Sequence, residues 1–398
     1  MSSILSVKKI TSLSGKRVLV RVDFNVAMKN GSVADDEKLK ASLPTISYLI
    51  GKGAKVILVS HLGRPEGKVV KSLSLAPVAN RLVKLLQAPV KHLPYYEGAQ
   101  VERAVSEMEP GEVIMLENIR FSSQEQGDKG NFARELALLA DVFVLDGFAV
   151  AHRGDASVSG VAKFLPSYAG LLLDKEINGL AKVTKNPASP FVAIIGGAKM
   201  ETKIPVINAL LPKVDALLVG GGILNTYLKG LGYGVGDSLV DKDYMADAIA
   251  YGKKRKIVWP VDVIVGKKNS LHGRHVMLET QPHQICKKGE AIFDIGPETV
   301  RLFAGYVHMA KTLVWNGAMG WFEQKPFDFG TLSVARLLAT RSKGKAFGVI
   351  GGGETVQSME MVGMTDDVDL VSTGGGAMLE FLAGEKLPGI EALKRKSK

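Results

Sequence analysis

Glycines in this chain gather directly after short apolar runs that are rich in β-branched residues. The four clearest cases are VAIIGGAK at 192–199, ALLVGGGI at 216–223, GVIGGGET at 348–355 and LVSTGGGA at 370–377. Apolar runs of this length predict strands that are buried on both faces, as in parallel sheets. Amphipathic helical patterns occur between these runs, such as those at 203–211 and 332–340. The repeated order of strand, glycine turn and helix predicts a doubly wound α/β fold.

The first half of the chain repeats this order with fewer glycines. Its candidate strands are 17–22, 55–60, 112–116 and 141–145, and its candidate helices lie near 37–51, 74–87 and 131–140. Because 398 residues exceed one ordinary core, we expect two Rossmann-like domains with mainly parallel sheets. A long helical pattern at 171–184 ends in the breaker-rich NPASP at 186–190, so the connecting helix and hinge are expected there. The expected domains are 1–170 and 171–377.

The charge balance indicates anionic partners. Lysine and arginine outnumber aspartate and glutamate by 51 to 40, which gives a formal net charge of +11. Nucleic acid and a small polyphosphate are both candidates. The basic residues are dispersed, however, and no aromatic-studded basic stretch resembles an RNA-recognition motif. We therefore expect no nucleic-acid partner.

Cysteine content and hydropathy bear on the compartment. The one cysteine, Cys286, cannot form an internal disulfide and fits a reducing environment. No apolar run reaches the roughly 18–20 residues of a membrane span, and the N-terminus lacks the apolar core of a signal peptide. We expect a cytoplasmic protein without a membrane partner.

Glycine turns between a strand and a helix can bind phosphates. Their backbone N–H groups lie at the positive end of the helix dipole, and glycine allows a ligand to approach closely. None of the four turns matches the Walker A pattern or a GxGxxG with a suitable acidic residue downstream. The glycine-rich GLGYGVG at 230–236 has no strand before it and is expected to be a loop. The predicted phosphate site therefore uses another loop design.

Lys199 and Lys203 stand four residues apart around the start of the helix expected after GGAK. That spacing places two ammonium groups on one helix face. Solvated lysines are the plain alternative, but the helix dipole disfavours cations at this end, which favours an anionic ligand. Glu354 follows three glycines at another helix start. Its carboxylate could hold Mg²⁺ between phosphates or simply complement the dipole.

Basic side chains follow the strands of the first half. His61 and Arg64 lie in SHLGRP, Arg120 in ENIRF and Arg153 in AHRGDAS. Loops at the carboxyl ends of parallel strands bind ligands in α/β proteins, and the guanidinium fork suits phosphate and carboxylate groups. A single arginine would more often be structural, but three in separate loops predict a pocket for a small, multiply anionic molecule. Arg21 lies inside a strand and is expected to be a buried ion-pair partner.

Nine short motifs occur in the order seen in the phosphoglycerate kinase family, which the whole chain resembles. They are RVDFNV (21–26), SHLGRP (60–65), ENIRF (117–121), AHRGDAS (151–157), GGAKMETK (196–203), DIGPET (294–299), WNGAMGWFE (315–323), GGGET (351–355) and STGGGAMLEFLAGEKLPG (372–389). The resemblance implies reversible glycolytic and gluconeogenic phosphoryl transfer between 1,3-bisphosphoglycerate and ADP, which gives 3-phosphoglycerate and MgATP. It also implies acid substrate on the first domain, nucleotide on the second, a monomer that closes by hinge motion, and a segment 378–398 that packs back on the first domain.

The resemblance implies a role for each matching position. The implied 3-phosphoglycerate contacts are Asp23, Asn25, Lys38, His61, Leu62, Gly63, Arg64, Arg120 and Arg153. The implied nucleotide contacts are Gly197, Lys199, Lys203, Asn316, Glu323, Gly352, Gly353, Glu354 and Thr355, with Glu354 as the Mg²⁺ ligand. The transferred phosphoryl group is implied to meet the amides of Gly374, Gly375 and Gly376. Lys199, Lys38 and Gly375 are the implied catalytic residues.

Several positions depart from the family pattern. The minor departures are Ala27 and Ala318 in place of proline, DGFA at 146–149 in place of DAFG, and Glu354 in place of aspartate. Lys38 matters most, because the family has an arginine there that contacts substrate and helps to stabilise the transition state. Lysine keeps the charge but lacks the planar fork. If the alignment slips, Lys40 takes this position, and it is also lysine.

Three functions are weighed against each other. An active phosphoglycerate kinase, weakened at Lys38, is the leading hypothesis. A catalytically weakened family member that acts as a nucleotide-binding sensor or interaction module is supported by Lys38 and opposed by Lys199 and Lys203. An NAD-binding oxidoreductase would need a GxGxxG turn with an acidic ribose ligand, and the sequence has none.

Overall fold

The computed structural model describes residues 4–394 and divides the chain into two compact units. Unit 1 extends to Asn178 and resumes at Lys386, and unit 2 spans Gly179–Glu385. The observed division therefore lies eight residues after the boundary expected at 170/171. The chain returns to unit 1 at 386, whereas 378 was expected.

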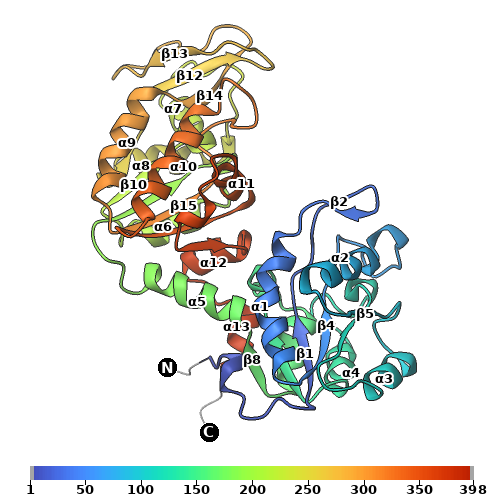
Figure 1. The fold of residues 1–398 in the computed structure, drawn as a ribbon. Helices are drawn as coiled ribbons and strands as arrows, with labels where there is room; N and C mark the ends of the chain where they lie inside the picture. The colour runs from blue at the N-terminus through green and yellow to red at the C-terminus, as the bar shows by residue number, and fades with distance from the viewer. Residues whose placement is uncertain (1–3, 395–398) are drawn as a thin grey trace. The chain divides into compact units, whose positions relative to one another are not determined.

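A six-stranded sheet forms the centre of unit 1, in the order β5-β6-β4-β1-β7-β8, and every neighbouring pair is parallel (Figure 1). Its strands are β1 (Arg17–Arg21), β4 (Lys55–Val59), β5 (Lys91–His92), β6 (Val113–Met115), β7 (Val142–Leu145) and β8 (Ser167–Ala169). A short hairpin, β2 (Met28–Lys29) with β3 (Ser32–Val33), follows β1. All four strands predicted in this half are confirmed.

Both faces of this sheet are buried, which is why its strands are apolar throughout. Val18 and Val20 belong to a core cluster with Leu39 and Leu82 of the helices, and the alternate residue Leu19 is equally inaccessible on the other face. The helices of unit 1 are α1 (Glu37–Gly51), α2 (Ala76–Leu86), α3 (Ala99–Ser106), α4 (Phe132–Leu138), the first part of α5 (Leu171–Thr184), and α13 (Pro388–Ala392). Doubly wound packing follows from this two-sided burial.

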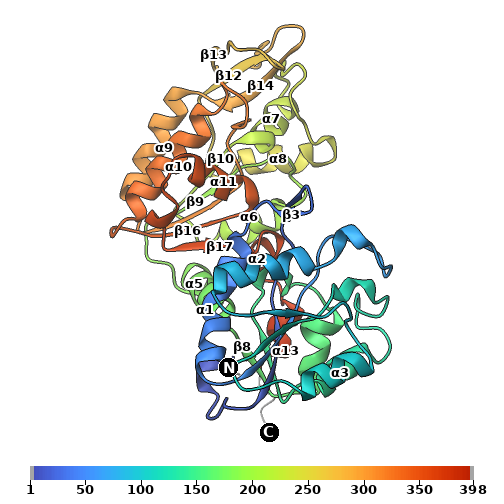
Figure 2. The ribbon, with the colours of Figure 1, turned by 45° about the vertical axis from the view of Figure 1, so that its right-hand side comes forward.

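Unit 2 has a second six-stranded sheet, in the order β11-β10-β9-β15-β16-β17, again with every pair parallel. Its strands are β9 (Phe191–Ile195), β10 (Ala216–Val219), β11 (Ile257–Val258), β15 (Thr312–Asn316), β16 (Phe347–Gly351) and β17 (Leu370–Ser372). Figure 2 shows α9 (Pro297–Met309) and α10 (Phe329–Ser342) on one side of this sheet and α7 (Gly221–Gly230) and α8 (Met245–Gly252) on the other. The predicted α/β class with mainly parallel sheets is confirmed.

Four helices of unit 2 begin near the glycine turns, as the sequence predicts. The helices of this unit are α6 (Ile204–Leu210), α7 (Gly221–Gly230), α8 (Met245–Gly252), α9 (Pro297–Met309), α10 (Phe329–Ser342), α11 (Gly353–Met361) and α12 (Gly376–Ala383). The chain from 231 to 236 is a loop, as expected. No helix among the described residues is both long and apolar enough to cross a bilayer.

An antiparallel sheet in unit 2 has no counterpart in the sequence predictions. It consists of β12 (Asp262–Lys267) between β13 (Arg274–Met277) and β14 (Glu290–Ile295). The sequence pattern of β13 does not mark it as a strand, because its residues alternate between partly buried and exposed and no glycine turn follows it.

The boundary lies inside α5 because each part of that helix packs on a different unit. Its first amides are capped within unit 1, where Leu171 N–H donates to Thr45 Oγ1 (2.9 Å) and Leu172 N–H to Asp146 Oδ1 (3.0 Å). At Gly179 a Cβ would lie 2.7 Å from Leu370 of β17, so the helix passes closely over the second sheet. At the other end of the chain, α12 packs on α6 within unit 2, and α13 packs on the turn η5 (Ala156–Gly160) of unit 1.

Candidate active site

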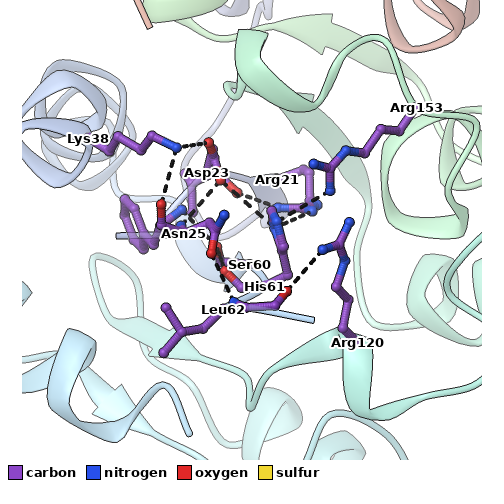
Figure 3. A network of polar contacts seen from close by, with 12 residues as sticks. Arg21, Asp23, Asn25, Lys38, Ser60, His61, Leu62, Arg120 and Arg153 are labelled. Carbon is purple, nitrogen blue, oxygen red and sulfur yellow. Dashed lines mark hydrogen bonds and ion pairs between the residues drawn. The ribbon is translucent and has the colours of Figure 1, made fainter. Parts of the chain in front are cut away.

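The loop after β1 carries the first group of predicted site residues. Asn25 Oδ1 accepts a hydrogen bond from Gly63 N–H (2.9 Å), and Asp23 Oδ1 accepts one from Asn25 N–H (3.2 Å). Lys38, in the first turn of α1, donates to Asp23 Oδ2 (2.7 Å) and to the Asn25 carbonyl (3.1 Å), as Figure 3 shows. Two loops and one helix are thereby fixed together at the carboxyl end of β1.

Lys38, and not Lys40, faces this loop. Lys40 pairs with Glu37 (2.7 Å) and Asp36 (2.9 Å) outside it. Hydrogen bonds to these two carboxylates raise the pKa of Lys40 above its ordinary value. The alternative alignment through Lys40 therefore has no support in the geometry.

His61 is buried between two guanidinium groups. Its Nδ1 lies 3.2 Å from Arg21 Nη2, and its Nε2 lies 3.3 Å from Arg153 Nη1 (Figure 3). Burial, followed by the charges of Arg21, Arg153 and Lys38, holds the pKa of His61 well below its ordinary value. The imidazole is therefore neutral and can both donate and accept.

Arg21 was expected to be a buried ion-pair partner, and this was wrong in detail. Its guanidinium is fully buried, but it donates to Ser157 Oγ (2.7 Å) and to the Val22 carbonyl instead of directly to a carboxylate. Glu125, Asp23 and Asp155 raise its pKa only through longer-range attraction, which burial outweighs. The strand-end position placed Arg21 next to His61, inside the cationic site.

Arg120 completes this group, which we call the basic cluster: Arg21, Lys38, His61, Arg120 and Arg153. Arg120 is buried, and its Nη1 donates to the Gly63 carbonyl (3.0 Å). Its Nη2 lies 4.0 Å from Asp155 Oδ2.

Three other residues of SHLGRP play different parts. Arg64 is exposed. Leu62 packs in the apolar core of unit 1, and its carbonyl accepts from Asn118 Nδ2 (2.7 Å), so its side chain is not available to a ligand. The amide of Gly63 is already bonded to Asn25. The side chain of Leu62 and the amide of Gly63 therefore hold the loop itself.

The second group of predicted residues lies in unit 2. Lys203 directly precedes α6, and its Nζ donates to Asn316 Oδ1 at the end of β15. Asn316 Nδ2 in turn donates to the Gly351 carbonyl (2.6 Å) at the end of β16. Burial lowers the pKa of Lys203 to about 8, against the attraction of Glu354. Lys199 is exposed in the bend before α6, so the two lysines do not share a helix face as expected.

Two glycines of this unit have backbone angles or neighbours that exclude a side chain. Gly197 has φ +96°, and a Cβ there would lie 3.4 Å from Lys203 Cε and 3.6 Å from Glu354 Oε2. Gly352 has φ +93°, and its Cβ would lie 2.9 Å from Asn316 Nδ2. These glycines keep space open between the Lys203 ammonium and the Glu354 carboxylate.

Most of the predicted nucleotide residues line one pocket of about 410 Å³, which we call the glycine-turn pocket. Its predicted members are Gly197, Lys199, Lys203, Asn316, Gly352, Gly353, Glu354, Thr355 and Gly375. Glu323 instead lines a neighbouring pocket of about 270 Å³, together with Gly197 and Glu354. The structure thus gathers residues from four separate glycine-rich or strand-end segments.

The three consecutive glycines at the start of α12, Gly374, Gly375 and Gly376, are not equivalent. Gly374 N–H already donates to Ser372 Oγ (3.1 Å), so its amide is not available for a phosphoryl group. Gly375 lines the glycine-turn pocket with φ +46°, and Gly376 is the exposed first residue of α12. The expected set of three amides is reduced to two.

Glu354 is the one predicted metal ligand, and its surroundings fit Mg²⁺. It is exposed at the second position of α11, at the edge of the glycine-turn pocket, with Oε2 3.5 Å from the Ala318 amide. Mg²⁺ in such sites is held by one or two carboxylates together with substrate phosphates. A single protein carboxylate beside a phosphate-sized pocket is therefore a suitable donor set.

Sequence reasoning missed several residues of these sites. Ser157 accepts a hydrogen bond from Arg21 and donates one to Glu125. Phe293 and Trp321 line the 270 Å³ pocket. Ser157 belongs to AHRGDAS and could have been found there. Trp321 likewise belongs to WNGAMGWFE, whereas Glu125 and Phe293 lie outside the motifs and only folding brings them to the site.

Comparison with known proteins decides the family. A family model described as phosphoglycerate kinase matches residues 7–385. The chain belongs to the phosphoglycerate kinase family. The phosphoglycerate kinase of Moorella thermoacetica is 47% identical over 393 residues, which cover 98% of each chain. That of Pelotomaculum thermopropionicum is 47% identical over 388 residues, which cover 96% of this chain and 97% of the relative.

Solved phosphoglycerate kinases share the fold. The structure from Coxiella burnetii has a TM-score of 0.86 at 40% identity and covers 98% of this chain and 99% of its own. The structure from Pyrococcus horikoshii has a TM-score of 0.85 at 32% identity, with 98% of both chains covered. Membership supports the predicted glycolytic phosphotransferase activity, so the enzyme is a phosphoglycerate kinase by family. Neither the sensor hypothesis nor the oxidoreductase hypothesis is favoured.

Proposed function

We propose that the basic cluster binds 3-phosphoglycerate or 1,3-bisphosphoglycerate and that the glycine-turn pocket binds ATP or ADP. The observation that carries this proposal is the burial of neutral His61 between Arg21 and Arg153. The guanidinium groups of Arg21 and Arg153 both direct N–H donors at His61 beside a strand-end loop, and neither contact involves a carboxylate. A multiply anionic acid supplies the missing acceptors.

Within the cluster, we assign Arg120 and Arg153 to the carboxylate or phosphate of the acid, with Arg64 reaching it from the exposed side of the loop. Asp23 and Asn25 would meet the hydroxyl and carboxylate end. Lys38 would neutralise charge that develops during transfer, as a point charge instead of a fork.

In the glycine-turn pocket, we assign Lys203 and Asn316 to the nucleotide phosphates and Lys199 to the transferred phosphoryl group. Gly352, Gly353 and Thr355 would line the nucleotide, and Glu323 would accept from the ribose hydroxyls. The free amides of Gly375 and Gly376 would bond the phosphoryl oxygens.

Phosphoryl transfer by these residues needs positioning and charge neutralisation but no protein base. The acceptor is an ADP phosphate oxygen in one direction and a carboxylate in the other, and both are already ionised. This fits a site made of cations, amides and neutral His61. Glu354 would hold Mg²⁺, which supplies positive charge to the nucleotide phosphates when it is bound.

Transfer requires the donor and acceptor to lie in line, so we propose that units 1 and 2 close by a hinge motion at α5 during turnover. The split of α5 between units supports this assignment. We further propose that the enzyme acts as a cytoplasmic monomer, without nucleic-acid or membrane partners, as suits a glycolytic kinase of small metabolites.

The test is ATP-dependent phosphorylation of 3-phosphoglycerate by the purified chain, with KM measured for both substrates. Arg153→Ala is expected to raise the KM for 3-phosphoglycerate about tenfold or more while leaving the KM for ATP unchanged. Arg103→Ala is the matched control, because Arg103 is exposed on α3 and pairs only with Glu107 (2.8 Å). Equal effects of the two variants, or a lack of turnover in the wild type, would overturn the proposal.

A further inference from the structure

A buried chain of hydrogen bonds runs from Glu125 to His61. Both carboxylate oxygens of Glu125 accept from Ser157, one from Oγ–H (2.6 Å) and one from the backbone N–H (2.9 Å). Ser157 Oγ accepts from Arg21 Nε (2.7 Å), and Arg21 Nη2 lies 3.2 Å from His61 Nδ1. Glu125 and Arg21 are fully inaccessible, and Ser157 nearly so. The phosphotransfer chemistry above gives no role to Glu125 or Ser157.

The donors and acceptors along this chain have only one consistent direction. A guanidinium can only donate, so Ser157 Oγ must accept from Arg21 and give its own hydrogen to Glu125. Arg21 Nη2 makes the shorter of the two arginine contacts to His61 (3.2 Å against 3.3 Å from Arg153), and a donation from Arg21 to Nδ1 places the proton of the neutral ring on Nε2. Glu125 orients the Ser157 hydroxyl, and that hydroxyl in turn holds the guanidinium of Arg21 that contacts His61.

The His61 proton then faces another donor. Nε2–H lies 3.3 Å from Arg153 Nη1, which also only donates. Two N–H groups that converge in this way do not satisfy each other. An anionic oxygen that accepts from both would complete the arrangement.

We propose that Glu125 and Ser157 are positioning residues for the acid substrate. By orienting Arg21, they hold His61 in the Nε2–H tautomer that donates, together with Arg153, to an anionic oxygen of 3-phosphoglycerate. This inference rests on the proposed role of the basic cluster.

Electrostatics around Glu125 support a role that depends on its charge. Burial raises the pKa of Glu125 to about 7, opposed by the charge of Arg21 and by the hydrogen bonds from Ser157. Asp155, just before the π-helical turn η5 (Ala156–Gly160), raises the pKa of Glu125 further by charge repulsion. The charges of Asp23 and Arg153 also act on Arg21. Protonation below this pH makes Glu125 a weaker hydrogen-bond acceptor and therefore weakens its hydrogen bonds from Ser157.

Ser157→Ala removes the hydroxyl link, and Ser157→Thr keeps it. Ser157→Ala is expected to raise the KM for 3-phosphoglycerate about tenfold, with the KM for ATP unchanged and with Ser157→Thr close to the wild type. Ser122→Ala is the matched control, since Ser122 is a buried serine of the same unit whose Oγ bonds only locally, to Gln124 N–H (3.3 Å). If all three variants behave alike, the inference is wrong.

A pH profile separates positioning from simple destabilisation. In the wild type, the KM for 3-phosphoglycerate should rise as the pH falls through 7, and Glu125→Gln should flatten that step because it cannot ionise. Thermal unfolding of each variant shows whether it is folded at the assay temperature. An unchanged step in Glu125→Gln would contradict a role for the Glu125 charge.

The tautomer of His61 can also be observed directly by NMR, independently of the kinetic measurements. Long-range ¹H–¹⁵N spectra of the wild type should show His61 as the Nε2–H form above pH 7, with the signal assigned by its loss in His61→Gln. Ser157→Ala should convert it to a mixture of tautomers. A His61 in the Nδ1–H form overturns the inference even if 3-phosphoglycerate binds normally, whereas failure of the wild type to bind 3-phosphoglycerate overturns the proposed function instead.

Discussion

Lys38 Nζ donates to Asp23 Oδ2 at 2.7 Å, so the lysine at the position where an arginine was expected is paired with a carboxylate of the same site. Asp23 is buried, while about a third of the Lys38 side chain is exposed. A lysine in this position has one charged atom to share between Asp23 and a substrate group. An arginine has a fork of five N–H donors and can serve both at once.

Lys38→Arg is therefore expected to raise turnover in the direction of ATP consumption, because the fork can keep Asp23 while it contacts the substrate. Lys38→Met should lower kcat by about a hundredfold, the usual effect of removing a preorganised donor to developing charge. Steady-state kinetics with both substrates saturating would check this pair. Wild-type turnover in Lys38→Met would show that another group has taken over this role.

Nucleotide affinity should fall as the pH rises through 8. Lys203 has a pKa of about 8 in the free protein, so its charge is present below that pH and is lost above it. Phosphate groups are already fully ionised in this range, since their second pKa is near 6. Calorimetric titration with ATP from pH 7 to 9.5 should show about a tenfold weakening. Lys203→Met should bind more weakly and without this step; an identical slope in that variant would assign the step to another group.

A side chain at Gly352 should disturb the nucleotide site through Asn316. A Cβ at Gly352 would lie 2.9 Å from Asn316 Nδ2, and Asn316 holds Lys203. Gly352→Ala should therefore cost both stability, by more than about 1 kcal/mol, and ATP affinity. Gly363→Ala provides the control, because Gly363 also has positive φ (+68°) but no atom within 4 Å.

The two variants separate backbone strain from contact. Gly363→Ala should lose stability in urea unfolding through its φ alone and should bind ATP as the wild type does. Loss of ATP affinity in both variants would mean that general destabilisation, and not displacement of Asn316, is responsible.

Asp146 should make the protein less stable as the pH rises from 4 towards 7. It is fully buried beneath the start of α5, and burial raises its pKa from 3.8 to about 7. Between these values the folded state binds more protons than the unfolded state, so the free energy of unfolding decreases with rising pH. Asp146→Asn keeps an acceptor for Leu172 N–H without the charge, and should be about 1–3 kcal/mol more stable than the wild type at pH 8.

The stability gain of Asp146→Asn should shrink as the pH approaches 5, which urea unfolding at several pH values would measure. Asp141→Asn is a control of opposite sign. Its hydrogen bonds with Arg17 lower the pKa of Asp141, so its ionised form stabilises the fold at neutral pH. A pH-independent gain in Asp146→Asn would show that Asp146 is not the group that titrates.

The sequence by itself determined the architecture and the family. Apolar runs such as 192–195 predict strands buried on both faces, and the glycines that follow predict tight turns into helices, because these signals depend only on neighbouring residues. The motif order identified the family, and it gave Lys199, Lys203 and Arg153 as expected site residues. The antiparallel strand β13 was missed because its residues are only partly buried and no local pattern marks its partner.

Tertiary structure alone decided which groups are free to act. The amide of Gly63 is occupied by Asn25, which lies 38 residues away along the chain, and no spacing reveals this bond. Glu125 reaches Arg21 only through Ser157, 32 residues along the chain from it, and their joint burial is what moves the pKa of the carboxyl. Local sequence sets backbone preference, whereas hydrogen-bond occupancy and desolvation depend on contacts between distant segments, and these exist only once the chain has folded.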